Sequence, residues 1–256
     1  MRCSRTKLYP KRRFSQNFLK HENSLRRIVE FAQIDNETVL EIGAGKGSLT
    51  KRIAEKAKRV FAIEIDQDLV AILADLGIPN VTVIKDDFLK IDLKEFEQPV
   101  IIGNIPYSIT TQILKRLVEQ RNAFKKSVLT IQKEYGDRIL AKPGDVQYGF
   151  ISLYVNYYFH AMKGFVIPAR FFSPKPKVDS VTIVLEKKEP APFLDNERAF
   201  FDFVQGIFRY RRKSVKNSVR HFTGRLPRDI DEQVLRKRPQ ELSLEDFNEL
   251  YQHSKA

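Results

Sequence analysis

The sequence predicts a doubly wound, mostly parallel α/β sheet followed by a small helical domain. Short apolar runs alternate with helical periodicities between residues 38 and 135. A glycine-rich turn follows the first run, as in nucleotide-binding folds. From residue 193 the pattern is that of short helices, after a segment with two prolines. We expect four parts: a basic arm at 1–22, the sheet domain at 23–186, a linker at 187–192 and the helical domain at 193–256.

The composition is that of a soluble globular protein, with 42% hydrophobic and 30% charged residues. No apolar run approaches the roughly 18 residues of a membrane span. The basic N-terminus also lacks the apolar segment of a signal peptide. A single cysteine, Cys3, excludes an internal disulfide and suits a reducing compartment. We therefore expect a cytoplasmic protein that does not bind membranes.

The net charge of +13 is concentrated in two segments. Residues 1–20 carry seven basic side chains and residues 205–228 carry eight, with no acidic residue in either. Solvated basic faces would explain them, but neither segment clearly shows the large apolar face that membrane-binding helices need. Two such clusters more often follow a phosphate backbone. Nucleic acid is the predicted partner.

The first predicted strand, 38–42, leads into a loop with glycine at positions 43, 45 and 47. A dinucleotide-binding fingerprint would need glycine at position 48, where the chain has Ser48. This departure disfavours a nicotinamide dehydrogenase. The next strand ends at Glu64, twenty-one residues after Gly43, where a carboxylate can bind ribose hydroxyls. A solvated charge at a strand end is the alternative for Glu64.

Two further strands, 81–84 and 127–131, complete five predicted strand–helix units. Asp66 is predicted to cap the helix that precedes the first of them. Asp86 and Asp87 follow that strand, and a carboxylate there could accept from the exocyclic amine of an adenine. A helix cap or a loop charge is an equal alternative for either residue.

The chain beyond residue 145 changes character. An aromatic-rich segment at 148–159 is predicted to be helical, and strands are predicted at 165–168 and 181–185. Between these strands lies a loop with two prolines and two lysines, which could present Phe172 as a stacking face. In the alternative, the loop is a stiff turn and Phe172 lies in the core.

The run Val100–Ile102 predicts a buried strand, and Gly103 ends it before Asn104, Pro106 and Tyr107. Open α/β sheets bind ligands at the carboxyl ends of their strands. A capped turn is one interpretation, because Asn and Pro both favour turns. The other is a pocket for a flat ring that carries an amine. There Tyr107 would stack, Asn104 and a backbone carbonyl would accept from the amine, and Pro106 would hold that carbonyl in place.

No classical catalytic cluster is present. The four histidines are scattered, and neither a zinc-ligand spacing, a nucleophile elbow nor a Walker loop occurs. We expect no metal. The chemistry must depend on positioning and on a reactive cofactor, which fits methyl transfer from a sulfonium.

Together these stretches resemble the ribosomal RNA adenine N6-dimethyltransferases, which are Rossmann-like class I S-adenosylmethionine-dependent methyltransferases. The family joins small-subunit dimethyltransferases to the erythromycin-resistance methyltransferases of the large subunit. The matching stretches run in family order: Ser15–Leu19, Glu41–Gly47, Ile63–Asp66, Gly103–Tyr107 and Phe171–Ser180.

The resemblance implies roles for particular residues. The cofactor S-adenosylmethionine would contact Asn17, Leu19, Gly43, Glu64, Asp87 and Asn104, with Asp87 rather than Asp86 facing its adenine. Asn104, Pro106 and Tyr107 would form the catalytic loop. The target adenine would stack on Tyr107 and Phe172, and Arg211, Arg212 and Lys213 would bind RNA.

The small-subunit branch is favoured by the stretches Gln132–Glu134, Ala141–Gly144, Tyr148–Gly149, Arg211–Lys213 and Leu242–Ser243, with Phe247. Ile105 and Lys46 look closer to the resistance branch, and Ser15 departs from the glycine that is usual at this position in bacterial small-subunit enzymes. We expect a monomer that dimethylates two adjacent adenines near the 3′ end of small-subunit ribosomal RNA, in a subunit precursor. The alternatives are a large-subunit methyltransferase, a non-catalytic RNA-binding assembly factor and a mitochondrial transcription-factor relative.

Overall fold

The computed structural model describes residues 17–189, 194–226 and 229–254. By their contacts, these residues group into two compact units. One contains the described residues up to Gly136 together with Met162–Lys187, and the other contains Asp137–Ala161 and the residues from Lys188 onward. Most of the expected basic arm, residues 1–16, lies outside the described residues, as do residues 190–192 of the expected linker and residue 193 of the expected helical domain. The bounds of the four expected parts stay predictions.

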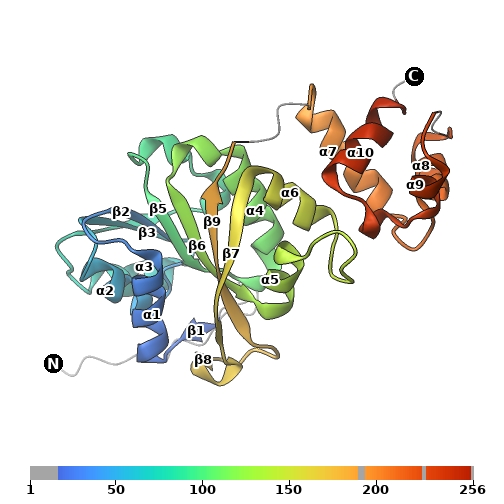
Figure 1. Ribbon diagram of the computed structural model, residues 1–256. Coiled ribbons are helices and arrows are strands. Elements are labelled where there is room, and N and C mark those ends of the chain that lie inside the picture. Colours follow the sequence, from blue (N-terminus) through green and yellow to red (C-terminus); the bar gives the residue numbers. More distant parts are fainter. Residues whose placement is uncertain (1–16, 190–193, 227–228, 255–256) are drawn as a thin grey trace. The chain divides into compact units, whose positions relative to one another are not determined.

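The first unit is built on a seven-stranded sheet with the order β4-β3-β2-β5-β6-β9-β7 (Figure 1). The strands from β4 to β6 pair in parallel with their neighbours, and β9 runs antiparallel to β6. The predicted doubly wound, mostly parallel sheet is confirmed. The strands are β2 (Thr38–Ile42), β3 (Arg59–Glu64), β4 (Val81–Lys85), β5 (Val100–Asn104), β6 (Lys126–Gln132), β7 (Phe159–Ile167) and β9 (Ser180–Lys187).

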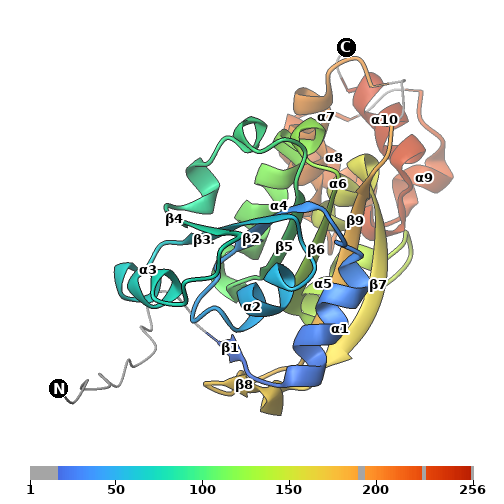
Figure 2. The same ribbon diagram turned by 90° about the vertical axis from the view of Figure 1, so that its left-hand side faces the viewer.

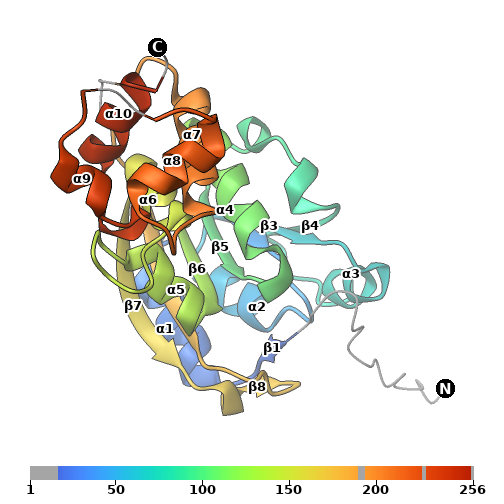
Figure 3. The same cartoon turned by 90° about the vertical axis from the view of Figure 1, so that its right-hand side faces the viewer.

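Helices cover both faces of this sheet. The helices α1 (Glu22–Ala32) and α2 (Ser48–Ala54) lie on one face (Figure 2), and α4 (Thr110–Glu119) lies on the other (Figure 3). The remaining helices of the alternating pattern are α3 (Gln67–Ala74) and α5 (Lys133–Leu140). The predicted cap of α3 is confirmed, because the Asp66 side chain accepts from the Asp68 N–H at 3.1 Å.

One of the five predicted strand–helix units is wrong. After β4 the chain forms two 3-10 turns, η2 (Phe88–Lys90) and η3 (Leu93–Glu95), instead of a helix. Asp87 and Asp92 each precede one turn, and each side chain accepts a backbone N–H two residues later. Two closely spaced caps of this kind start two short turns rather than one continuous helix.

The central strands have the composition of a sheet that is covered on both faces. Val100, Ile101 and Ile102 of β5 are at most 1% exposed. A Cβ at Gly103 would lie 3.0 Å from the Ile42 Cβ and 3.1 Å from the Ile42 carbonyl oxygen. Glycine therefore allows β2 and β5 to meet closely, directly before Asn104.

A second, two-stranded sheet pairs β1 (Phe18–Leu19) with β8 (Phe172–Ser173). The strands are antiparallel, and Leu19 lies opposite Phe172. Both side chains are buried in the main core of the first unit. This ladder fixes the first described residues of the chain against a segment more than 150 residues later.

The second unit is helical. The predicted helix at 148–159 is confirmed as α6 (Phe150–Tyr158), which contacts α7 (Glu197–Phe208). Phe201 of α7 packs against Tyr154 and Tyr157, with ring centroids 4.9 and 5.2 Å apart. The remaining helices are α8 (Val215–Thr223), α9 (Glu232–Arg236) and α10 (Leu244–Gln252), the last of which Ser243 caps as predicted. Among the described residues, no helix is long and apolar enough to cross a membrane.

Candidate functional site

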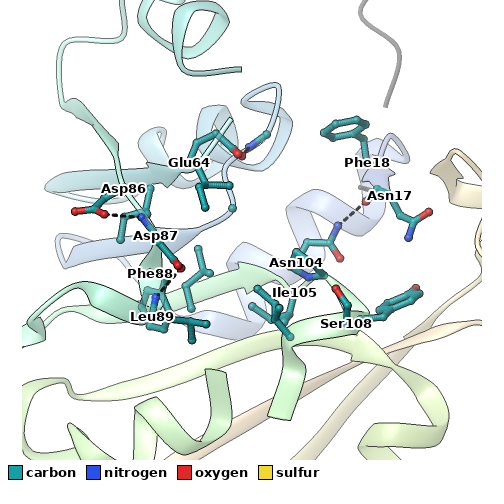
Figure 4. Close-up of a pocket in the computed structure, with 18 residues that line it drawn as sticks. Asn17, Phe18, Glu64, Asp86, Asp87, Phe88, Leu89, Asn104, Ile105 and Ser108 are labelled. Atoms are coloured by element: carbon teal, nitrogen blue, oxygen red, sulfur yellow. Dashed lines mark hydrogen bonds between the residues drawn. The ribbon is translucent and has the colours of Figure 1, made fainter. Parts of the chain in front are cut away.

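A cavity of about 220 Å³ opens where the parallel strands β2, β3, β4 and β5 end (Figure 4). The predicted residues Asn17, Gly43, Glu64, Asp87 and Asn104 line it, as do Pro106 and Tyr107. Between them lie the apolar side chains of Ile42, Ile63, Ile65 and Phe88. The cavity therefore combines an apolar floor with polar groups supplied by the strand ends and by Asn17, which precedes β1.

Glu64 braces the glycine-rich loop. One carboxylate oxygen accepts from the Gly45 N–H and the other from the Asp66 N–H, each at 2.9 Å. Burial raises the pKa of Glu64, and these two backbone hydrogen bonds oppose the increase. Each oxygen has a second lone pair, so the carboxylate can still accept from a ligand in the cavity.

The adjacent acids Asp86 and Asp87 both line the cavity. Asp87 accepts from the Leu89 N–H at 3.0 Å, and Asp86 accepts from the Asp87 N–H at 2.7 Å. The capping role considered for these residues is thus confirmed for Asp87 alone, and both carboxylates still line the cavity. In Figure 4 both acids lie with Glu64 on the side opposite Asn104.

Asn104 is fixed by the start of the described chain. Its side-chain Nδ2 donates to the Asn17 carbonyl oxygen at 2.9 Å, across 87 residues of sequence (Figure 4). Because the Asn104 Nδ2 donates to Asn17, the Oδ1 of Asn104 is the atom that can accept a hydrogen bond from a ligand. The next residue, Ile105, donates its N–H to the Thr130 carbonyl at 2.9 Å, so the loop is also attached to β6.

Pro106 and Tyr107 continue this loop along the cavity. Pro106 has a φ of −57° and precedes the turn η4 (Tyr107–Ile109). Burial is the main cause that raises the pKa of the Tyr107 phenol. The phenol is therefore neutral at physiological pH, which makes its ring a stacking surface rather than a base.

Two predicted site residues lie elsewhere. The expectation that Phe172 presents a stacking face is wrong, because its side chain is only 5% exposed and belongs to the core. Its pairing with Leu19 explains this position, since the β1–β8 ladder turns both side chains inward. Leu19 is also absent from the lining of the main cavity and lines a smaller hollow of about 40 Å³ beside the glycine-rich loop.

The predicted RNA-binding cluster lies in the second unit, between α7 and α8. Arg211 donates from Nη2 to the Val146 carbonyl oxygen at 2.8 Å. Arg212 and Lys213 are exposed. The three basic residues therefore differ, since Arg211 holds a loop of its own unit and the other two project from the surface.

Sequence reasoning missed two residues near the glycine-rich loop. Phe18 lines the cavity, and a Cβ at Gly45 would lie 3.0 Å from its ring. Glu41 is only 2% exposed, and among the described residues its Oε2 has no hydrogen-bond partner. The sequence could have identified Glu41, because it is the only carboxylate in the otherwise mostly apolar strand Thr38–Ile42.

The model of the family described as "Ribosomal RNA adenine dimethylase" matches residues 8–252 of this chain. The chain belongs to this family. It is accordingly a ribosomal RNA methyltransferase of the adenine dimethylase type, as its motifs led us to expect.

Among its relatives is a Staphylococcus aureus protein named "Ribosomal RNA small subunit methyltransferase A". It is 38% identical over 96% of this chain and 90% of its own length. A solved dimethyladenosine transferase from Plasmodium falciparum is 29% identical, with a TM-score of 0.74, and covers 91% of this chain and 95% of its own. The structure of the 23S rRNA methyltransferase ErmE, at 24% identity and a TM-score of 0.66, covers 94% of this chain and all of its own and shares the fold.

Glu41 generates a prediction about the pH dependence of stability. Burial raises its pKa from 4.5 to about 7, the Thr50 side chain opposes this, and the charge of Glu64 adds to it. Between pH 4.5 and 7, Glu41 is therefore protonated in the folded protein but ionised in the unfolded chain. The stability that the protonated form contributes is complete below pH 4.5 and is lost as the pH rises through 7.

We therefore predict that Glu41→Gln, which keeps the shape and removes the charge, loses less stability than the wild type as the pH rises. The difference in the change between pH 5 and 8 should be about 3 kcal/mol, from 1.36 kcal/mol per pKa unit. Urea unfolding of both proteins at several pH values measures it. Parallel pH profiles would show that Glu41 does not carry this proton.

Proposed function

We propose that this protein transfers methyl groups from S-adenosylmethionine to the N6 amines of two adjacent adenines near the 3′ end of small-subunit ribosomal RNA. The observation that carries the proposal is the position of Asn104 at the cavity, with its Nδ2 donating a hydrogen bond to the Asn17 carbonyl. The small-subunit assignment is supported by the 38% identity to a small-subunit methyltransferase. We propose that the enzyme acts as a cytoplasmic monomer on a subunit precursor.

The residues of the cavity fit this cofactor. Glu64 has acceptor capacity for ribose hydroxyls, and Asp87 can accept from the exocyclic amine of an adenine. Ile65 and Phe88 offer apolar contacts for the ring. Gly43 has a φ of +68°, a left-handed conformation that favours glycine, and so the loop can approach a ligand closely. Leu19, whose side chain is buried, could contribute through its backbone.

S-adenosylmethionine, when bound, supplies a methyl group on a positively charged sulfur. The residues of the chain act on the acceptor. The N6 lone pair of adenine is delocalised into the ring and is a weak nucleophile. If Asn104 Oδ1 and the Ile105 carbonyl accept the two N6 hydrogens, the lone pair is localised and directed along the line of transfer.

Tyr107 completes the acceptor side. Its neutral ring would hold the target base, which must be unpaired or turned out of a helix to enter the cavity. No general base is needed, because the methylated ammonium is acidic and releases its proton to water. Dimethylation requires only that the same pocket accepts an amine that already carries one methyl group.

Asn104→Ala should reduce methyl transfer by at least a hundredfold at saturating RNA, because the main acceptor for N6 is lost. Cofactor affinity should stay within about tenfold, or 1.4 kcal/mol. Single-turnover transfer of a labelled methyl group and calorimetric titration of the cofactor measure the two effects. Near-normal turnover of the variant would contradict the assigned role of Asn104.

Arg212→Gln together with Lys213→Gln should weaken RNA binding and flatten its salt dependence. Two lost phosphate contacts lower the slope of log affinity against log salt by about 1.5 to 2, because fewer counterions are released. Arg211 is kept, since it holds the Val146 carbonyl.

The matched control is Lys56→Gln with Lys58→Gln. These exposed lysines precede β3, at the opposite end of the strands from the cavity. The control should keep the wild-type slope. An unchanged slope for the Arg212 and Lys213 variant would mean that these side chains are only a solvated surface.

The target assignment is tested by incubating the protein and labelled cofactor with each ribosomal subunit separately. We expect label only in small-subunit RNA, on two adjacent dimethylated adenines. Label confined to large-subunit RNA would contradict the assignment to the small-subunit branch but not the proposed methyl-transfer mechanism. If neither RNA is labelled even when unmethylated subunit precursors are supplied, the proposed activity is wrong and a non-catalytic assembly factor is favoured.

A further inference from the structure

The hydroxyl of Tyr107 lies 2.9 Å from the hydroxyl of Ser180, which is 73 residues later in the sequence. Ser180 is the first residue of β9 and is fully buried. It pairs in register with Gln132, the last residue of β6. A residue of β9, which lies two strands from β5 in the sheet, thus reaches the ring that lines the cavity.

Ser180 is itself held firmly. The carbonyl of Asp179 accepts from the Lys133 N–H at 2.9 Å, and the Asp179 carboxylate accepts from the Ala169 N–H at 2.9 Å. The β6–β9 ladder continues directly from this point. The Ser180 hydroxyl is therefore attached to a rigid part of the sheet.

Tyr107, by contrast, stands in a short turn between β5 and α4. It begins a three-residue turn that contains no buried residue, and its side chain is only partly buried. Such a ring can rotate about its side-chain bonds unless its far end is held. The hydrogen bond to Ser180 holds that end, so β9 sets the direction in which the ring points.

We propose that Ser180 is a positioning residue for methyl transfer, acting through Tyr107. By holding the phenol, it keeps the ring in the orientation on which the target base stacks. This inference rests on the proposed function, because it assumes that an adenine stacks on Tyr107. It assigns a role to a motif residue that the mechanism does not otherwise use.

The test is a double-mutant cycle with Ser180→Ala and Tyr107→Phe. Each change removes one hydroxyl and keeps the carbon frame. We expect each single variant to reduce single-turnover transfer about five- to tenfold at saturating RNA. The double variant should be no slower than either single one, since both remove the same interaction. The cofactor dissociation constant should not change.

The chain offers a matched control in Ser127→Ala. Ser127 is a fully buried serine of β6, and among the described residues its hydroxyl has no hydrogen-bond partner. This variant should keep the wild-type rate. A second readout is the fluorescence of 2-aminopurine placed at the target position, where stacking on Tyr107 quenches emission. Quenching should weaken in Ser180→Ala and stay unchanged in Ser127→Ala.

If Ser180→Ala transfers methyl groups at the wild-type rate, the inference is wrong. It is also wrong if the effects of the two single variants multiply in the double variant, because they would then act separately. Either result leaves the proposed function intact. Failure of the wild-type protein to methylate any ribosomal RNA would instead overturn the proposed function, and this inference with it.

Discussion

The hydrogen bond from the Asn104 amide to the Asn17 carbonyl is the interaction on which the site depends. An asparagine side chain can present either its oxygen or its nitrogen, and its hydrogen-bond partners decide which. A carbonyl can only accept, so Asn17 takes the N–H end and leaves the oxygen as the acceptor that we propose binds a substrate amine. Asn17 has this position because β1 pairs with β8, with Leu19 and Phe172 buried beneath it. Phe172 thus supports the site through the core, although it does not line the cavity.

The two sides of the cavity carry different kinds of chemical group. Glu64, Asp86 and Asp87 place carboxylates on one side, where they can bind hydroxyls and amines of a cofactor. Asn104 and Tyr107 place a neutral acceptor and a neutral ring on the other. No group with the pKa of a general base is needed, because the product of transfer is itself an acid. The geometry therefore supports a reaction that is accelerated by alignment and by orientation of a lone pair, rather than by proton removal.

The parts of the site that lie at strand ends could be predicted from the sequence. Apolar runs that end in Gly43, Glu64 and Asn104 belong to parallel strands, and parallel strands bring their carboxyl ends to one edge. What could not be predicted depends on pairings between distant segments. The burial of Phe172 follows from the β1–β8 ladder, and the contact between Tyr107 and Ser180 follows from the position of β9. The grouping of α6 with the C-terminal helices rests on aromatic packing around Phe201, which no local periodicity reveals.

The central claim, that Asn104 directs the N6 amine of an adenine, is tested most directly by a crystal structure with a bisubstrate analogue. In that analogue, the N6 of adenosine is joined covalently to the sulfur-bearing half of the cofactor. The account predicts that N6 lies about 3 Å from both Asn104 Oδ1 and the Ile105 carbonyl oxygen. It also predicts that Asn104 Nδ2 stays bonded to the Asn17 carbonyl. A complex in which N6 faces Asn104 Nδ2, or contacts neither oxygen, would contradict it.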